Sequence, residues 1–505
     1  MSGARRVAAD FGPPAAALAA QWGLHRAVPA VPFAPFSLGD WLIRRTPGRL
    51  ATVAIEHLGH NALHVLATAT IVGALGLGAV LRHRQPAVLA LVAAAGTLLA
   101  ARLDPYRPRP IPTTAAAFVA AAAAGVTAVA AGGRRRATTS RSTTAADPGR
   151  RQLIAFLGLL GGALVLGVAD LRAALRPGLS HVVRADRPAR IPRDEAFSHP
   201  LTGLSPSVTP TSDHYRVSIN LDDPVVPASG WRLRLTGSVE RDMAWSFDDL
   251  AGMPTVERLA VLSCISNTVG GPLVGCSRWT GVPLADLLHA ARPRPSAVAV
   301  EAHGADGYFD VIPLSDAARP GVMVALGMNG QNLTVGHGFP ARLRVPGRYG
   351  VKNVKWLQQL VVLDHDQLGY WGHRGWDAAA VVHTESRVDT PAANATVSSP
   401  VIAAGVAWAG DRGISLVEVS TDDGKSWARA RLERETDQLA WRRWQLMLDL
   451  TPGSHPITVR ATDGQGQLQS PARTSPHPAG ATGWHRVVIT VKGRNALSPG
   501  RVPSP

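Results

Sequence analysis

The sequence contains 505 residues, a length that accommodates roughly three structural units. Its formal net charge is +16, but residues 1–200 contain 23 of the 52 lysines and arginines and only 9 of the 36 acidic residues. Residues 201–505 are therefore nearly neutral, and they show no basic stripe with interleaved aromatic residues, so nucleic-acid binding is not expected. Two cysteines are too few for a disulfide-stabilised scaffold.

Four long apolar stretches follow an N-terminal segment, residues 1–55, which is too interrupted by Pro, Trp, His and Arg to form a confident span. The stretches are rich in Ala, Leu, Val and Gly and nearly free of charge, which is typical of membrane-spanning helices. Buried helices of a soluble protein are the alternative, but four such stretches in succession favour a membrane region. Residues 56–171 are thus predicted to form four transmembrane helices, at 61–81, 86–103, 111–131 and 153–171.

Basic loops predict the orientation of these helices. Positively charged loops stay in the cytoplasm, and the loop at residues 134–151 carries the largest arginine cluster, although arginines at 102–109 and 172–193 conflict with a simple count. Gly149-Arg-Arg-Gln-Leu-Ile154 looks like a twin-arginine export signal, for which an ordinary basic flank is the alternative. We expect a multi-pass protein of the cell membrane with everything after Leu171 on the extracytoplasmic side.

Three histidines, His57, His60 and His64, share one helical face at the entry to the first apolar stretch. A haem with two histidine ligands takes them from facing helices, and the other predicted spans contain no histidine. Haem is therefore not expected, and interhelical or interfacial hydrogen bonding is the favoured interpretation.

The rest of the sequence divides at changes in composition. Residues 172–205 are rich in Arg, Pro and Ser, which is typical of a linker. Residues 206–370 mix short strands and helices in an α+β pattern, and residues 395–492 show closely spaced strands typical of an immunoglobulin-like β-sandwich. A junction, 371–394, lies between these two domains, and 493–505 form a tail.

Individual elements can be placed within both domains. The first is expected to contain strands at 231–235, 256–262, 297–302, 342–345 and 356–363 and helices at 246–251 and 284–291. The second is expected to contain strands at 401–409, 415–420, 427–432, 443–449, 455–461 and 485–491. Asp423-Gly424 is a hairpin turn signal between two of the latter.

Cys264 ends an apolar strand in the run Arg258-Leu-Ala-Val-Leu-Ser-Cys-Ile-Ser-Asn267, and Gly270 and Gly271 follow. This pattern places a sulfur at the mouth of a sheet beside backbone that can approach a bulky ligand. A thiolate is a soft ligand that suits a redox-active metal. A disulfide with Cys276 is the alternative, and it would consume the thiolate.

A second run, His337-Gly-Phe-Pro-Ala-Arg-Leu-Arg-Val-Pro-Gly-Arg-Tyr-Gly-Val-Lys-Asn-Val-Lys-Trp356, is a strand followed by a Gly-rich loop. Gly347 and Gly350, on either side of Tyr349, let backbone N–H groups turn toward an anion, and Lys352 and Lys355 add charge. Arg342 offers a planar donor for a phosphate or a polar ring. Arg344 alternates in step with Arg342 and remains unassigned.

Together these two runs resemble the sulfite oxidase family of molybdopterin-dependent oxidoreductases, here of a membrane-anchored bacterial type. The resemblance covers roughly residues 206 to 492. It implies that Cys264 ligates molybdenum held by a molybdopterin, and that residues in both runs and in flanking loops contact the cofactor. These cofactor-binding candidates are Tyr215, Arg216, Asn267, Asp306, His337, Arg342, Tyr349, Gly350, Lys352 and Lys355.

For several of these candidates a purely structural role is the alternative. Asp306 lies in Ala305-Asp-Gly307, which also reads as a turn, and Asn267 could be only a turn residue. Tyr215 and Arg216 could belong to an entry strand, with Asn220 in the same loop. The resemblance also covers a stretch at the domain junction, where site and packing cannot be separated: Trp371, Arg374, Trp376, Ser386 and Arg387.

The resemblance implies oxygen-atom transfer with a small oxo-acceptor or oxo-donor substrate, a separate electron-transfer partner such as a cytochrome or quinone, and a possible homodimer. Thr268-Val-Gly-Gly271 lacks the arginines that help to hold sulfite in animal and plant members of the family. A reductase of sulfoxides or N-oxides on the same fold is therefore an alternative. A cofactor-free, membrane-tethered binding module is another.

Overall fold

The computed structural model describes residues 33–46, 61–81, 182–186, 188–189, 194–197 and 201–493, with the isolated positions 15, 18, 19, 21–23, 25, 50, 51 and 54. The chain forms two compact units. The first comprises Met1–Ser180, Ser218–Trp231 and Ala305–Tyr308, and the second comprises His181–Val217, Arg232–Gly304 and Phe309–Pro505.

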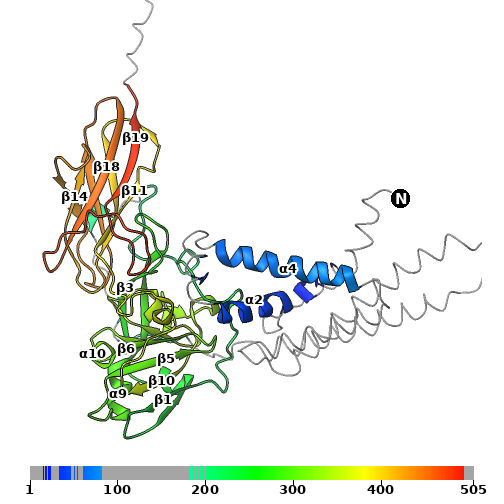
Figure 1. Ribbon diagram of the computed structural model, residues 1–505. Coiled ribbons are helices and arrows are strands. Elements are labelled where there is room, and N and C mark those ends of the chain that lie inside the picture. The colour runs from blue at the N-terminus through cyan, green and yellow to red at the C-terminus, as the bar shows by residue number, and fades with distance from the viewer. Residues whose placement is uncertain are drawn as a thin grey trace, which may run out of the picture. The chain divides into compact units, whose positions relative to one another are not determined.

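In the first unit, helix α2 (Ala34–Arg45) packs against helix α4 (Asn61–Leu81) (Figure 1). Helix α2 begins at a proline-containing first turn, which suits the fixed backbone angle of proline. Its Asp40 carboxylate accepts from the backbone N–H of Leu221 (2.6 Å), and Arg44 Nη1 donates to the Asp306 carbonyl (3.0 Å). These bonds attach two loops of the later sequence to the helix.

Helix α4 has the bounds predicted for the first apolar stretch. Within the described part of the chain, no helix combines the length and apolar character needed to cross a bilayer. The other three predicted spans, the twin-arginine run, His57 and His60 lie outside the described residues, as does the side chain of His64.

The first part of the second unit is an α+β domain with two sheets, as predicted (Figure 1). One sheet has the order β2 (Met243–Ser246), β1 (Arg232–Gly237), β10 (Leu357–Leu363), β5 (Ala299–Gly304), β6 (Phe309–Pro313). The other has the order β3 (Val256–Ser263), β4 (Val274–Pro283), β7 (Met323–Met328), β8 (Gln331–Asn332), with β9 (Arg342–Arg344) also paired to β7.

Short helices connect these strands: α8 (Phe247–Ala251), α9 (Leu284–Ala291) and α10 (Leu314–Ala317), with 3₁₀ turns η1 (Glu195–Phe197), η2 (Val335–His337), η3 (Gly350–Lys352) and η4 (Gly372–Arg374). Helix α8 begins at a capping box, in which Ser246 Oγ accepts from the Asp249 N–H and the Asp249 carboxylate accepts from the Ser246 N–H. Helix α9 has the predicted bounds.

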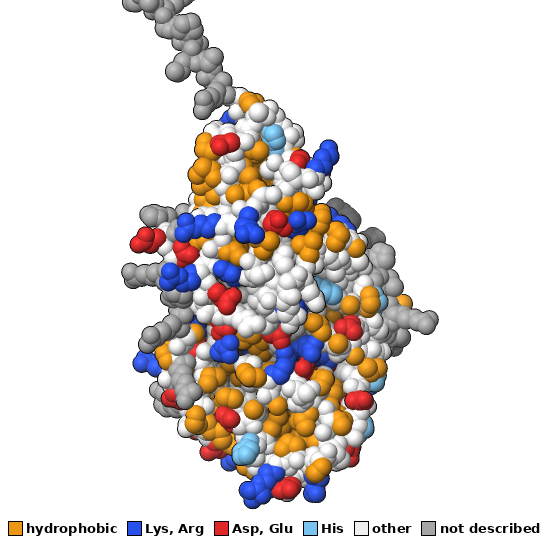
Figure 2. Space-filling model, turned by 90° about the vertical axis from the view of Figure 1, so that its left-hand side faces the viewer, with side chains coloured by type: hydrophobic (Ala, Val, Ile, Leu, Met, Phe, Trp, Pro, Cys, Tyr) orange, Lys and Arg blue, Asp and Glu red, His pale blue; other side chains and the backbone are white. Residues whose placement is uncertain are grey.

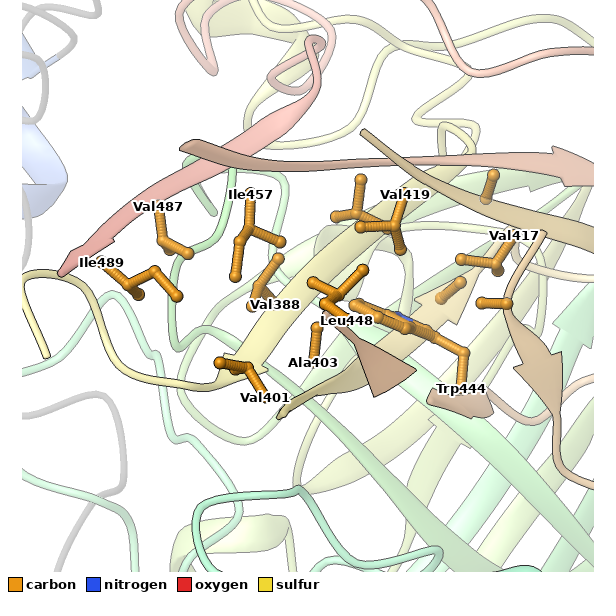
Figure 3. Packing of buried hydrophobic residues seen from close by; sticks show 14 of the residues in the cluster. Val388, Val401, Ala403, Val417, Val419, Trp444, Leu448, Ile457, Val487 and Ile489 are labelled. Atoms are coloured by element: carbon orange, nitrogen blue, oxygen red, sulfur yellow. The ribbon is translucent and has the colours of Figure 1, made fainter. Parts of the chain in front are cut away.

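The second part of this unit is a β-sandwich. One sheet has the order β11 (Glu385–Thr390), β13 (Val401–Trp408), β17 (Arg442–Leu448), β16 (Arg431–Leu432), and the other has the order β12 (Thr396–Val397), β19 (His485–Val491), β18 (Gly453–Asp463), β14 (Ile414–Ser420), β15 (Ala428–Arg429). The two sheets enclose an apolar core around Trp444, with Val417 and Ile457 facing it from the opposite sheet (Figure 3). The sandwich therefore begins at Glu385, within the segment predicted as a junction.

Two local features of the sandwich follow from the sequence. Asp423 and Gly424 both have positive φ, 58° and 86°, and they join β14 to β15 in an antiparallel hairpin, as predicted. The strand predicted at 427–432 is instead split, because β15 pairs with β14 in one sheet and β16 pairs with β17 in the other.

Charged side chains are mixed on the face of the molecule shown in Figure 2. Lys and Arg lie among Asp and Glu across the middle of this face, beside scattered apolar side chains. This pattern agrees with the nearly neutral composition of residues 201–505.

Candidate active site

Cys264 follows directly after β3, which pairs antiparallel with β4. Its backbone N–H donates to the Leu273 carbonyl (2.9 Å) and so closes the loop between the two strands. The sulfur lies 3.0 Å from Ser266 Oγ, and Cys264 is only 6% exposed. Cys264 and Cys276 are both free thiols, so the alternative of a disulfide between them is wrong.

Burial raises the pKa of the Cys264 thiol, and three hydrogen-bonding groups at the sulfur partly oppose that effect. These groups are the Ser266 side chain and the backbone N–H groups of Ser266 and Ile265. Successive N–H groups aimed at one atom form an anion-binding concavity. A bound metal cation would deprotonate a thiol in this setting.

Asn267 completes the loop after Cys264. Its Oδ1 accepts from the backbone N–H of Leu273 (2.9 Å), which fixes the amide orientation. Asn267 is 2% exposed, and its Nδ2 has no hydrogen-bond partner within the described residues. The amide therefore stabilises the loop and leaves one buried donor unused.

Gly350 brings the second predicted run to Cys264. A Cβ added at Gly350 would lie 3.0 Å from Tyr215 Oη, which is tight, and 3.8 Å from Cys264 Cα, which is ordinary van der Waals contact, so Gly350 packs between the two residues. Burial raises the pKa of the Tyr215 phenol, and the nearby Cys264 raises it further. Tyr215 is therefore a neutral phenol beside the sulfur-bearing loop.

His337, Arg342 and Lys355, which the family resemblance groups as cofactor contacts, lie close together in the structure. His337 Nε2 is 3.1 Å from the Thr211 carbonyl, Arg342 Nη1 is 3.5 Å from the His337 carbonyl, and Lys355 Nζ donates to the Gly336 carbonyl (3.4 Å). Burial lowers the pKa of His337 to about 4, and the charges of Arg342 and Lys355 act in the same direction. The imidazole is therefore neutral at physiological pH.

Arg342 and Arg344 form a buried pair of cations over the ring of Trp279. Their Cζ atoms lie 5.5 and 4.5 Å from the ring centroid. Burial lowers the pKa of Arg342 to about 10 and that of Arg344 to about 9, so both remain charged at neutral pH. Among the described residues, neither guanidinium pairs with a carboxylate, and neither Nε has a hydrogen-bond partner.

His214 belongs to this cluster although the sequence did not single it out. Its ring stacks on Tyr215 with centroids 5.3 Å apart and meets His337 edge-on at 5.5 Å. Burial lowers its pKa to about 3, and its Nε2 has no partner in the described chain. Its position next to Tyr215 is the one feature of the sequence that could have indicated a place in this cluster.

Lys352 differs from its predicted role. It is buried, and its Nζ forms an ion pair with Asp310 Oδ1 (2.6 Å) and donates to the Val311 carbonyl (2.8 Å). Its charge is therefore compensated inside the domain, and it does not supply an open cation for the Gly-rich loop. Arg216, by contrast, is exposed, and its charge lowers the pKa of His337.

Asp306 and Asn220 belong to the first compact unit. Asn220 Nδ2 donates to Asp306 Oδ2 (3.0 Å), and Asp306 Oδ1 accepts from the Tyr308 N–H (3.0 Å). The carboxylate thus stabilises its own turn, which was the alternative interpretation. A role in binding the pterin stays a prediction.

The predicted junction residues separate into packing and loop contacts. Trp376 packs edge-on against His477, and the Arg374 guanidinium lies 3.7 Å from the Tyr370 ring centroid. Ser386 donates to Gln469 inside the sandwich (2.7 Å). Arg387 instead donates from Nη1 to the Gly271 carbonyl (2.9 Å), in the loop after Cys264.

Family models match both domains of the second unit. Residues 220–371 match an oxidoreductase molybdopterin binding domain, and residues 377–492 match a Mo-co oxidoreductase dimerisation domain. The sulfite oxidase of Gallus gallus is 30% identical over 321 residues, which cover 53% of this chain and 70% of that protein. The chain belongs to the sulfite oxidase family.

Other relatives define the limits of this likeness. Mitochondrial sulfite oxidase of Macaca fascicularis is 30% identical over 54% of this chain, which spans 60% of that protein's length. A putative protein-methionine-sulfoxide reductase subunit of Azospira oryzae is 33% identical over 31% of this chain and 58% of its own length. The sulfane dehydrogenase SoxCD of Paracoccus pantotrophus shares the fold, with a TM-score of 0.51 and 22% identity over 63% of this chain and 97% of that chain.

The residues of this sulfite oxidase family member fit a molybdopterin. The cluster offers unused buried donors at Asn267, Arg342 and Arg344 and a free thiol, and no carboxylate pairs with its two buried guanidiniums within the described residues. A site rich in donors and poor in acceptors suits a ligand with a phosphate and a polar ring system. The described residues contain no group of three or more His, Cys, Asp or Glu that could hold a metal by themselves.

A buried carboxyl near this site makes the folded state sensitive to pH. Glu385 is 4% exposed, its Oε1 is 3.4 Å from Tyr349 Oη, and burial raises its pKa from 4.5 to about 8. The folded protein holds a proton that the unfolded chain releases, so the free energy of unfolding should fall by up to a few kcal/mol as the pH rises from 4.5 to 8. Glu385→Gln should flatten this slope, as measured by urea unfolding at several pH values. Parallel curves for the two proteins would contradict the assignment.

Proposed function

We propose that this chain is a molybdopterin-dependent oxidoreductase that carries out oxygen-atom transfer in the manner of sulfite oxidases. The observation that supports this most is a buried free thiol, Cys264, together with a pair of buried guanidiniums that have no carboxylate partner in the described chain, all of which act on the pKa of Tyr215. Buried guanidiniums without a carboxylate partner cost stability in an apo protein, and a cofactor phosphate would compensate for that cost, while the free thiol is available to bind a metal.

Each residue has a defined task in this proposal. Cys264 would be the protein ligand to molybdenum, and Arg342, His337 and Lys355 would hold the molybdopterin. Tyr215 would close the pocket beside the thiolate as a neutral phenol. When bound, the cofactor supplies the two-electron oxygen chemistry, and the protein supplies binding, orientation and exclusion of water.

Elemental analysis tests this proposal directly. Protein purified from a host that makes molybdopterin should contain about one molybdenum per chain, as expected for a single cysteine ligand. It should also transfer electrons from sulfite to an artificial acceptor. Protein without molybdenum from such a host would instead support the cofactor-free binding module.

Reduction of a neutral oxide is the second candidate. The loop Thr268-Val-Gly-Gly271 carries no cation, and the Arg387 guanidinium, which donates to the Gly271 carbonyl, is already paired with Asp389 Oδ1 (2.6 Å). An anionic substrate would then lack compensation from this loop. The Azospira oryzae relative, named as a sulfoxide reductase subunit, is consistent with this direction. A screen of sulfite, sulfoxides and N-oxides with one redox dye distinguishes the two candidates by their kcat/KM values.

We also propose that the N-terminal region anchors the enzyme in the cell membrane, with the second unit on the extracytoplasmic side. The support is the set of four apolar stretches and the arginine-rich loop at 134–151. Electrons would then pass to or from a separate cytochrome or quinone. Fractionation and protease accessibility in spheroplasts test this: a protein recovered in the soluble cytoplasmic fraction would contradict it.

A homodimer through the sandwich is expected from the dimerisation-domain match. Ile402 and Met447 are cross-strand neighbours on β13 and β17, and they are 39% and 64% exposed, so a second copy could cover this sheet face. Met447→Glu should convert the dimer to a monomer in light scattering. Leu468→Glu, at a residue 48% exposed outside this sheet, is the matched control. An unchanged mass for Met447→Glu would place the interface elsewhere.

A further inference from the structure

Strand β11 has two faces with different partners. Ser386 donates to Gln469 (2.7 Å), and Val388 packs in the apolar core, so both belong to the sandwich. Alternate residues of a strand point to opposite faces. The alternate side chains therefore point away from the core of the sandwich, and they contact the oxidoreductase domain. These are the side chains of Glu385, Arg387 and Asp389.

Arg387 is held rigidly at the loop that follows Cys264. Its Nη1 donates to the Gly271 carbonyl (2.9 Å), its Nε donates to Asp389 Oδ1 (2.6 Å), and its Nη2 donates to Ser205 Oγ (2.9 Å). Asp389 Oδ2 accepts from the Ser205 N–H (3.0 Å). A guanidinium fixed in three directions at once presents a defined donor to the loop carbonyl.

His485 of β19 contacts the same loop. Gly270 has a φ of 76°, and a Cβ added there would lie 2.2 Å from His485 Nε2, so the ring packs directly on this glycine. The His485 Nδ1 accepts from the Val388 N–H (3.0 Å), which fixes the ring orientation. Two residues of the sandwich therefore restrain two consecutive glycines.

Glu385 contacts the second loop near Cys264, the Gly-rich segment that contains Tyr349 and Gly350. Its carboxyl lies 3.4 Å from Tyr349 Oη, which also accepts from the His383 N–H (3.2 Å). Tyr349 is 1% exposed and immediately precedes Gly350, where an added Cβ would lie 3.8 Å from Cys264 Cα. The same strand thus contacts the segments that lie on both sides of the thiol.

We propose that β11 is a positioning element of the active site, in which Arg387 and Glu385 hold the loops at Gly271 and Gly350 so that Cys264 stays in its ligating position. The inference rests on the proposed function for its purpose, but the restraint itself is a property of the apo chain. A Gly-rich loop gains much conformational entropy when it is released, so it needs external contacts to stay fixed. A metal ligand must be held within about 0.5 Å to act.

The apo protein provides a test that does not involve the cofactor. The rate of alkylation of Cys264 by iodoacetamide, followed by peptide mass spectrometry, reports local opening of the loop. Arg387→Ala should accelerate this alkylation at least about tenfold, because a charge-assisted hydrogen bond to the loop is lost. Cys276 is fully buried in the adjacent strand, and it should stay unlabelled unless the domain unfolds.

Three further variants separate local from global effects. Ser386→Ala removes a buried hydrogen bond from the other face of β11, so it should lower stability without changing the labelling of Cys264. Arg387→Lys keeps the positive charge beside Asp389 but loses the planar set of guanidinium donors. It should give an alkylation rate for Cys264 between those of wild type and Arg387→Ala. Glu385→Leu should accelerate labelling from the Gly350 side. Equal rates for wild type, Arg387→Ala and Glu385→Leu, or joint labelling of Cys264 and Cys276, would overturn the proposal.

The holoenzyme then connects the restraint to the cofactor. Molybdenum loss from Arg387→Ala should be faster than from Ser386→Ala when each is incubated at the same interval below its own Tm. Equal retention would overturn the positioning role and leave the proposed function intact. Absence of molybdenum from the wild-type protein would overturn the proposed function, while the alkylation result would still decide whether β11 restrains the loop.

Discussion

Cys264→Ser should reduce turnover by more than about 100-fold, beyond the upper end of the loss seen when an outer-shell partner of a metal ligand is removed. The thiol is the one cysteine at the mouth of β3, and a hydroxyl is a poorer ligand for a soft, redox-active metal. The fold should be retained, because a serine is close in size to a cysteine and can also make the hydrogen bond that joins the sulfur to Ser266 Oγ. We expect a Tm within a few degrees of wild type.

Cys276→Ser is the matched control for this variant. Cys276 is also buried and free, and its pKa is raised to about 12 by burial, but it lies within β4 opposite Val261. Its activity per folded molecule should equal that of wild type. If Cys264→Ser retained full activity with one molybdenum per chain, the thiolate would not be the metal ligand, and the proposed mechanism would be wrong.

The site residues that could be predicted from the sequence lie mainly in two continuous runs. Cys264 ends an apolar strand, and His337, Arg342 and Lys355 share one strand-and-loop segment, so the family resemblance could be recognised in short stretches of sequence. From the sandwich, Glu385 contacts Tyr349, 36 residues earlier in the chain, and His485 packs on Gly270, more than two hundred residues earlier. No local pattern can report such contacts, because domain packing creates them.

Lys352 and β4 show how tertiary contacts override local signals. The Gly-rich loop predicted that Lys352 would be available to bind an anion, but its ammonium group forms a buried ion pair with Asp310 of β6. Strand β4 was not predicted because it contains Gly275 and Gly281, and glycine is disfavoured in strands. It forms as the strand between β3 and β7, where a Cβ at Gly281 would lie 2.2 Å from the Val324 carbonyl.

Arg342→Met should have opposite effects on the apo and holo proteins. In the apo protein it removes a buried charge with an unpaired Nε, which costs about 1–3 kcal/mol, so the free energy of unfolding should rise by a similar amount. In a cofactor-competent host it removes the donor that would hold the cofactor, so molybdenum should fall below about a tenth of the wild-type content, as expected for loss of a charged hydrogen bond.

Arg460→Met provides the comparison for this prediction. Arg460 also lies over a tryptophan, 4.0 Å from the Trp427 ring centroid, but it is paired with Glu418 Oε2 (2.9 Å). Its loss should lower stability slightly and leave the molybdenum content unchanged. Metal analysis and urea unfolding of both variants, with and without cofactor, measure these effects. A destabilised apo Arg342→Met with normal molybdenum would show that Arg342 is a structural cation, because its charge would then be compensated without the cofactor.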